Sequence, residues 1–283
     1  MKTDTSEAGL ESHIVSAMTG AGWIAGSPSD YDREYAVDLG QLLAFLVETQ
    51  PETFEALGVS EDGPSRRKFL ARIQGEISKR GVTNVLRRGV KHGPHDIDLF
   101  YGTPSPGNPQ AAVRHAQNRF SVTRQLRYSR DETQLALDLC LFINGLPIAT
   151  FELKNSLTKQ TVADAVQQYK RDRDPRERLF EFGRCVVHFA LDDQEIRMST
   201  HLKGKASWFL PFNLGWNDGA GNPPNPHGLK TDFLWKRILT LAGLTDVLEN
   251  YAQVVETKDE RTGRKKAIQI FPGTTSSTSY ESS

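Results

Sequence analysis

The sequence predicts an α/β protein in which helices flank a mixed central sheet. Residues 65–80 follow Pro64, carry apolar side chains at helical spacing and stop at Gly81, so they predict a helix. Three runs rich in β-branched, aromatic and leucine residues come next and predict antiparallel strands at 119–129, 135–143 and 147–153. A helical pattern at 160–171 and strand-like runs at 184–191 and 195–200 follow, and this order of elements is typical of a mixed sheet.

The two ends of the chain are expected to add peripheral elements to this core. Helical spacing at 9–20 and 37–49 predicts that residues 1–64 form a helical segment packed on the core. We expect the core domain to span 65–271 and to finish with two short helices. The low-complexity tail, 272–283, is predicted to be disordered.

Composition excludes several classes of protein. The 283 residues contain 35 basic and 35 acidic side chains, so bulk charge does not favour a protein that holds DNA by net charge alone. No apolar run is long enough to cross a membrane and the N-terminus does not resemble a secretory signal, so a cytoplasmic protein is expected. Cys140 and Cys185 lie in apolar strand-like runs and are expected to be buried free thiols.

Two predicted strands carry residues suited to metal-dependent hydrolysis. In PIATFELKN, strand alternation places Glu152 and Lys154 on one face, and the preceding run LALDLCLFI is apolar except for Asp138. Carboxylates can hold one or two Mg²⁺ ions, and an ammonium can orient a water and stabilise developing charge. We therefore expect Asp138 and Glu152 to be metal ligands, with the backbone carbonyl of Leu153 as an additional ligand and Lys154 positioning the water.

The hairpin between these strands imposes a geometric condition on the site. A strict two-residue turn at Asn144-Gly145 would pair Ile143 with Leu146 and send Asp138 and Glu152 to opposite faces. A three-residue turn would instead place Asp138 opposite Thr150, diagonal to Glu152 on one face. The sequence thus predicts an odd-length turn or a bulge. On spacing alone, a solvated Glu152–Lys154 ion pair on an exposed strand is an open alternative.

These residues lie in a longer stretch that resembles a known family. LDLCLFINGLPIATFELKN is similar to the signature of the N-terminal nuclease domain of the restriction (R) subunits of type I restriction-modification enzymes, a PD-(D/E)XK domain. NRFSVTRQLRY, DAVQQYKRDRDPRERLFEFGRCVVHFAL, FLPFNLGWNDGAGNPPNPHG and FLWKRIL resemble flanking family segments in the same order. The resemblance covers roughly residues 80–271 and implies a restriction-endonuclease-like core in which Asp138, Glu152 and Lys154 are catalytic.

The chain departs from the family pattern in two places. The family has a glutamine followed by a tyrosine four residues later in the post-catalytic helix. Gln168 is the nearest counterpart and is expected to be catalytic, but Asp172 stands at the tyrosine position and Tyr169 is adjacent instead. The R subunits also continue into an ATP-driven motor, whereas no G-x-x-x-x-G-K-[ST] motif occurs here. We expect no ATP site in this chain, which we interpret as a fragment or a naturally short form.

Several other charged residues are candidates for the site, but each also has a purely structural explanation. Arg119, Arg124 and Arg127 could contact DNA phosphates or belong to a solvated strand. Glu76 and Asp98 are candidate accessory acids, although Glu76 could instead pair with cations on its own helix and HGPHDID, which contains Asp98, could be a loop entering a strand. No G-x-S-x-G elbow supports a nucleophilic triad.

The resemblance implies a magnesium-dependent endonuclease domain that hydrolyses double-stranded DNA, with Mn²⁺ able to substitute for Mg²⁺. Its expected partners are the methylation and specificity subunits of a type I complex, with no membrane association. One alternative is a catalytically idle scaffold that docks subunits and keeps the nuclease fold. Another is a nuclease of the same fold that acts alone in repair or in a mobile element.

Overall fold

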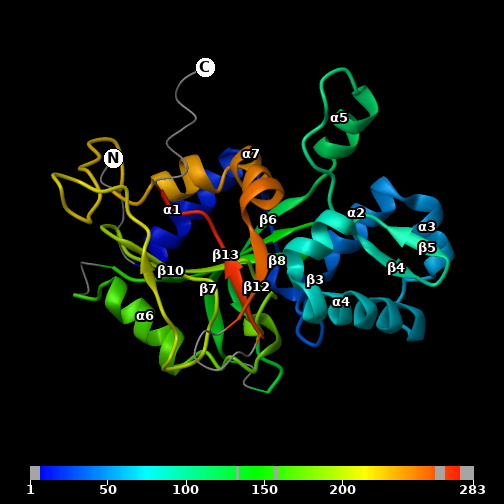
Figure 1. Ribbon diagram of the computed structural model, residues 1–283, viewed down its shortest axis with the longest axis horizontal. Coiled ribbons are helices and arrows are strands. Elements are labelled where there is room, and N and C mark those ends of the chain that lie inside the picture. The colour runs from blue at the N-terminus through cyan, green and yellow to red at the C-terminus, as the bar shows by residue number, and fades with distance from the viewer. Residues whose placement is uncertain (1–6, 132–133, 156–158, 259–264, 275–283) are drawn as a thin grey trace.

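A computed structural model of the chain describes residues 7–131, 134–155, 159–258 and 265–274. Its centre is a seven-stranded sheet with the order β1-β6-β7-β8-β9-β10-β11 (Figure 1). Strands β6 to β8 are antiparallel, β8 and β9 are parallel, and β1 pairs in parallel with β6. The predicted mixed sheet is confirmed. The strands are β1 Ile24–Ala25, β6 Phe120–Arg127, β7 Ala136–Ile143, β8 Leu146–Leu153, β9 Val187–Leu191, β10 Ile196–Ser199 and β11 Leu210–Pro211.

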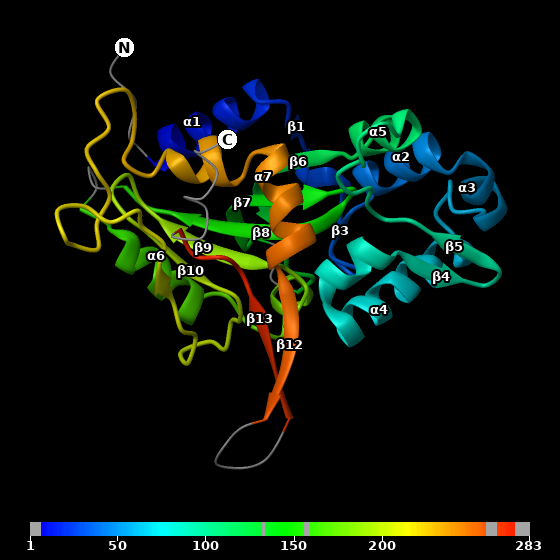
Figure 2. The same ribbon diagram turned by 45° about the horizontal axis from the view of Figure 1, so that its top comes forward.

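Helices cover both faces of this sheet. In Figure 2, α1 lies above the central strands and α6 lies below them. One apolar cluster joins α1, α2 and α4 to one face through residues such as Leu141 and Phe151. A second cluster packs α6 on the other face through Cys140, Phe142 and Tyr169. The helices are α1 Glu7–Gly20, α2 Leu39–Thr49, α3 Pro51–Leu57, α4 Pro64–Arg88, α5 Pro109–Ala116, α6 Val162–Arg171 and α7 Leu241–Asp246.

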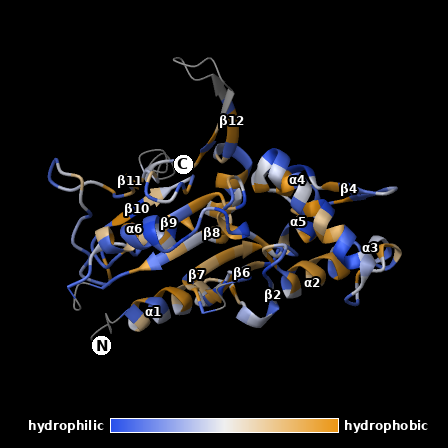
Figure 3. Ribbon diagram, turned by 90° about the horizontal axis from the view of Figure 1, so that it is seen from below, coloured by the Kyte–Doolittle hydropathy of each residue, from blue (hydrophilic) through white to orange (hydrophobic). Residues whose placement is uncertain are grey.

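The hydropathy of the chain follows this layering. Figure 3 shows mostly hydrophobic residues along the strands in the middle of the sheet and hydrophilic residues on the visible side of α6. Both cysteines are buried free thiols, as predicted. Within the described residues, no helix is long and apolar enough to span a bilayer.

The β7–β8 hairpin satisfies the predicted condition through a bulge. Its turn has two residues, Asn144 and Gly145, which both adopt positive φ, and Ile143 pairs with Leu146. The pairing then shifts between Leu141 and Phe142, because one additional residue of β8 is accommodated there. The bulge was predicted correctly. The three-residue turn and the pairing of Asp138 with Thr150 were wrong, because Thr150 lies opposite Cys140.

The N-terminal segment contributes a strand as well as helices. Ile24 and Ala25 pair with Ser121 and Val122 at the edge of the main sheet. Two small hairpins lie outside that sheet, β2 Tyr31–Asp32 with β3 Val37–Asp38 and β4 Val90–His92 with β5 His95–Ile97. The long helix α4 does not end at Gly81: this glycine is non-helical with φ 78°, yet the helix continues to Arg88. Residues Val85–Arg88 are therefore helical.

The C-terminal part replaces the two predicted helices with shorter pieces and a hairpin. Residues Leu234–Ile238 and Val247–Tyr251 form π-helical turns on either side of α7. The strands β12 Gln253–Lys258 and β13 Lys265–Ile270 then pair in an antiparallel hairpin that the sequence did not predict. The predicted tail lies outside the described residues from 275 onward. Within its described part, Thr274 donates a hydrogen bond to the carbonyl of Asn213.

Candidate active site

The β7–β8 hairpin brings the predicted acids to opposed positions. Leu139 pairs with Phe151, so continuing the register by one residue sets Asp138 opposite Glu152. Side chains at directly opposed positions leave the sheet on the same face. This face also carries Thr150 and is the one that α6 covers. The bulge is the reason the acids meet, because a regular two-residue hairpin would have separated them.

Glu152 is completely buried and asymmetrically bonded. Its Oε1 accepts a hydrogen bond from Arg173 Nε at 2.5 Å, whereas its Oε2 has no hydrogen-bond partner among the described residues. Arg173 follows α6, donates also to the carbonyl of Ala136 at 2.8 Å and lies 5.5 Å from the ring centre of Tyr128. Burial raises the pKa of Glu152 to about 8, against the opposing effect of the Arg173 guanidinium.

Asp138 is partly buried beside the backbone of the neighbouring strand. Its Oδ2 accepts the N–H of Leu153 at 2.7 Å, and its Oδ1 lies 3.5 Å from Gln125 Nε2. Burial raises the pKa of Asp138 to about 6, and the nearby Glu7 raises this pKa further, while the Leu153 N–H and Lys154 lower it. Its negative charge also raises the pKa of Glu152. The two carboxyl groups therefore interact electrostatically, and a cation shared between them would stabilise the ionised form of both.

Lys154 lies just beyond the end of β8 and is 8% exposed. Its Nζ is 2.9 Å from Oε1 of Glu7 in α1, and its charge lowers the pKa of both Asp138 and Glu152. It is therefore a buried ammonium next to three acids rather than part of a solvated Glu152–Lys154 pair. This observation argues against the alternative that the E-x-K motif is a solvated ion pair on an exposed strand.

Helix α1 supplies acids that the sequence interpretation missed. Glu7 and Glu11 are one helical turn apart. Glu11 is buried, with 3% of its surface exposed, and it accepts hydrogen bonds from Arg124 and, at 2.5 Å, from Gln125 Nε2. Arg173 was also missed as the partner of Glu152. The available signal was the four-residue spacing of the two acids next to the apolar stripe of α1. No local pattern revealed their contact with Lys154 and Arg124, because 113 or more residues separate the partners.

Gln168 lies on the flank of α6, half-buried, and its side chain makes no hydrogen bond with a described residue. The neighbouring Tyr169 instead points to the sheet, where its hydroxyl is 2.8 Å from Thr150 Oγ1. Thr150 is in turn 2.7 Å from Nδ1 of the buried His188. Burial lowers the pKa of His188 to about 3, so this histidine is neutral at physiological pH.

The arginines expected to contact DNA differ in their surroundings. Arg124 pairs with Glu11, and Arg119 donates to Gln41 at 2.8 Å and lies 3.7 Å from Glu48. Arg127 is exposed, and within the described residues its side chain has no bonded partner. The charge of Arg124 is thus compensated by Glu11, and that of Arg119 is partly compensated by Glu48.

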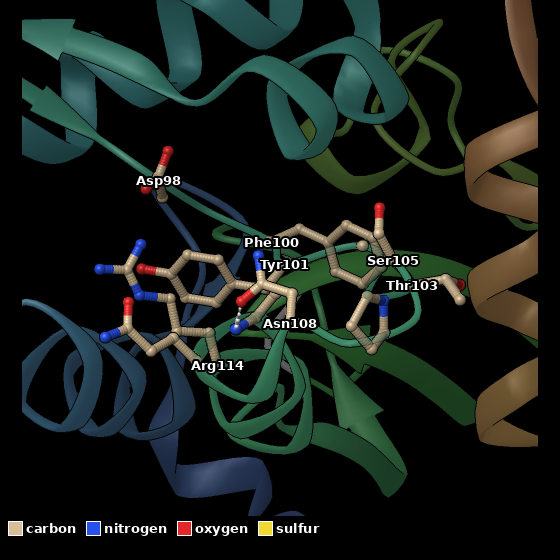
Figure 4. A pocket seen from close by; sticks show the side chains of 11 residues that line it. Asp98, Phe100, Tyr101, Thr103, Ser105, Asn108 and Arg114 are labelled. Atoms are coloured by element: carbon tan, nitrogen blue, oxygen red, sulfur yellow. Dashed lines mark hydrogen bonds between the residues drawn. The ribbon is translucent and has the colours of Figure 1, made fainter.

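The structure places neither accessory acid with Asp138 and Glu152. Glu76 pairs with Arg72, Lys79 and Arg80 on its own helix at 3.0 to 3.5 Å, and these cations lower its pKa. Asp98 lies after β5, where its backbone bonds to Gln50. It lines a pocket with Tyr101 and Arg114 that contains none of the catalytic candidates (Figure 4). No group of three or more His, Cys, Asp or Glu side chains is arranged for a metal within the described residues, HGPHDID included.

A mixed sheet flanked by helices, with an acid facing an E-x-K pair across a hairpin, defines an α/β protein compatible with a restriction-endonuclease-like core. Residues 4–207 match the family model described as type I restriction enzyme R protein N terminus. The chain belongs to this family, as its resemblance indicated. No curated protein matches the chain.

Proposed function

We propose that this chain is a magnesium-dependent endonuclease domain that hydrolyses phosphodiester bonds of double-stranded DNA. The observation that carries the proposal is the buried Glu152, opposed to Asp138 and adjacent to the enclosed ammonium of Lys154. Family membership supports it, because a restriction enzyme cuts DNA. Target choice would then belong to methylation and specificity subunits, in line with the neutral overall charge of this chain.

The residues present fit a divalent cation. Glu152 Oε2 is a buried acceptor with no partner in the part of the chain that the structure describes, and such an atom is costly unless a cation or donor meets it. Asp138 and the carbonyl of Leu153 would complete a hard oxygen donor set, and Mg²⁺ commonly binds one or two carboxylates and keeps several waters. The lack of a three-acid group in the described residues is compatible with this chemistry. Mg²⁺ or Mn²⁺, when bound, would act as a Lewis acid on the phosphate and its attacking water.

The side chains of this site then have separate tasks. Burial favours the protonated forms of Asp138 and Glu152, and Lys154 opposes this effect by favouring the ionised form of both, which is the form that binds a metal. An ammonium has three donors, so Lys154 can keep its bond to Glu7 while it orients a water or stabilises charge on the phosphate. Arg173 holds Glu152 through Oε1 and leaves Oε2 available.

Cleavage of supercoiled plasmid in Mg²⁺, without ATP, tests the proposal. We expect Lys154→Ala to cut at least about 100-fold more slowly than the wild type, since removing one charge-stabilising group costs about that much. Lys154→Ala should still bind Mn²⁺ in calorimetry, whereas Asp138→Asn should lose both cleavage and Mn²⁺ binding. Lys68→Ala, an exposed change on α4, serves as the matched control and should cut normally.

The Arg173–Glu152 ion pair favours one second candidate, the catalytically idle scaffold. The Arg173 guanidinium already satisfies one carboxylate oxygen of Glu152, as it would in a purely structural pair. The scaffold requires that wild type and Lys154→Ala be equally inactive at high enzyme concentration and that neither bind Mn²⁺. A wild type that binds Mn²⁺ and cuts DNA excludes it.

A further inference from the structure

A cleft of about 550 Å³ on the outer side of α6 is lined by cations. Its walls are Gln167, Lys170 and Arg171 from the end of α6 and Lys205 from the loop after β10. No carboxylate lines it. A smaller cavity of about 160 Å³ is lined by Lys203 of the same loop, by His201 and by the exposed Trp208, again without an acid.

This concentration of charge is unusual for the molecule. The chain as a whole is neutral, and many of its other cations pair with acids, as Arg124 does with Glu11 and Lys236 with Asp232. In contrast, Lys170, Arg171, Lys203 and Lys205 have no ion pair with any carboxylate in the described part of the chain. A basic last turn stabilises a helix through its dipole, which would account for Lys170 and Arg171 alone. That effect does not explain the two lysines of a separate loop.

The loop that carries Lys203 and Lys205 is held in place. The N–H of Lys203 donates to Ser207 Oγ at 2.7 Å, and the buried Ser207 bonds back to the carbonyl of Gly204. A Cβ built on Gly204 would lie 3.9 Å from the carbonyl of Lys170, so the loop packs against the end of α6. The backbone that carries the two lysines is therefore held in place before any ligand arrives, which reduces the entropy cost of binding.

The cleft is connected to the candidate catalytic strand through a single helical turn. Tyr169 and Arg173 are four residues apart and reach the sheet, where they contact Thr150 and Glu152. Lys170 and Arg171 lie between them in sequence and line the cleft on the outside. A polyanion bound there would be held beside the helix that packs on Glu152.

We infer that the cleft between α6 and loop 203–206 binds the phosphate backbone of duplex DNA and so holds the substrate for the site at Asp138, Glu152 and Lys154. This inference rests on the proposed function, since it names how that site retains its substrate. The contacts are to phosphates, so they position DNA without reading its sequence. On this inference the principal DNA contacts are the cations of the cleft and its loop, not Arg119 and Arg124.

Fluorescence anisotropy of a labelled DNA duplex, titrated at several salt concentrations without divalent metal, tests the inference. Each phosphate contact removed lowers the slope of log affinity against log salt by about 1. We expect Arg171→Ala/Lys205→Ala to lower that slope by about 2 and to weaken binding about equally for unrelated sequences. Lys205→Arg should restore most of the affinity lost in Lys205→Ala. Lys68→Ala/Lys91→Ala removes two exposed cations elsewhere and should bind as the wild type does.

An unchanged slope in Arg171→Ala/Lys205→Ala, or an equal loss in the control pair, would overturn the inference. Circular dichroism melting establishes that each variant is folded. Binding of duplex RNA in preference to duplex DNA would also overturn it.

If the cleft variants lose DNA affinity but the wild type never cuts, the inferred DNA-binding surface is supported and the nuclease proposal fails. If the wild type cuts and the cleft variants bind DNA unchanged, only the surface is wrong.

Discussion

Glu152 has two carboxylate oxygens in different surroundings, and this difference supports the metal-ligand role proposed for it. Arg173 bonds to Oε1 and stabilises the buried carboxylate, while Oε2 has no partner within residues 7–131, 134–155, 159–258 and 265–274. Breaking a buried ion pair by removing one member costs several kcal/mol, because the other charge is left uncompensated. Arg173 is therefore required to keep Glu152 in place, and a metal that binds Oε2 does not have to displace it.

His188 gives a prediction for the pH dependence of stability. Its folded-state pKa is lowered to about 3 from 6.5, so its contribution is fully present above pH 6.5 and is lost as the pH falls toward 3. Between pH 7 and pH 5, the wild type should lose about 2 kcal/mol more of its unfolding free energy than His188→Asn loses. Urea unfolding of both proteins at the two pH values measures this difference. An equal loss in both would show that His188 is not buried in its neutral form.

Residue patterns located the hairpin acids but not their neighbours. Asp138 was conspicuous as the single charge in an apolar strand, and Glu152 and Lys154 as an acid and base two residues apart. Glu7 and Arg173 carry no comparable local pattern. Their roles arise from contacts across the fold, Glu7 with Lys154 and Arg173 with Glu152.

At the scale of elements, the β7–β8 hairpin decides whether the site exists. Its turn is anchored from several sides, since Asn144 accepts from the N–H of Arg119 and donates to the carbonyl of Leu99. Gly145 accepts from the N–H of Asp38 at the start of α2. The turn thereby fixes the end of the hairpin, and the bulge beyond it sets the face on which Asp138 appears.

Gly145→Ala tests this anchoring. Gly145 has φ 81°, and an added Cβ would lie 2.4 Å from the carbonyl oxygen of Asp38, so both backbone strain and a clash with α2 are expected. We predict a loss of about 3 kcal/mol in unfolding free energy. Gly107→Ala is the matched control, because Gly107 has φ 83° but nothing within 4 Å, and it should cost only about 1 kcal/mol. Equal losses in chemical denaturation would refute the close approach.

Element boundaries show which sequence signals were reliable. The strands β6, β7 and β8 and the helix α6 follow their predictions because composition and periodicity agreed along each of them. The stop at Gly81 was misplaced because the interruption is local: the apolar residues Val82, Val85 and Leu86 beyond it are buried and continue the helix. The hairpin β12–β13 was missed because its strands contain many charged residues and lack a strong apolar alternation.

At the scale of the molecule, the N-terminal segment is built into the core. Its strand β1 extends the main sheet, Trp23 packs on Phe120 with ring centres 5.6 Å apart, and Glu7 reaches Lys154. These stabilising contacts are with the central sheet, so the segment would lose them if the sheet unfolded and the segment remained folded alone. We therefore expect α1 and the central sheet to unfold together.

Urea unfolding provides the measurement for this prediction. The fluorescence of Trp23, isolated by changing the exposed Trp208 and Trp216 and the buried Trp235 to Phe, should report the same midpoint as far-UV circular dichroism of the same variant. Coincident transitions indicate one cooperative unit. A fluorescence change at clearly lower urea would show that residues 1–64 unfold as a separate domain.

The sequence by itself determined the class of fold, the order of the central elements, the family and the positions of Asp138, Glu152 and Lys154. It did so because strand alternation, turn residues and a single acid within an apolar run are local features of the sequence. Only the tertiary structure decided the register of Asp138 opposite Glu152, the partners Glu7 and Arg173, and the cation-lined cleft beside α6. These depend on a one-residue bulge and on contacts between distant segments, and local periodicity contains no information about either.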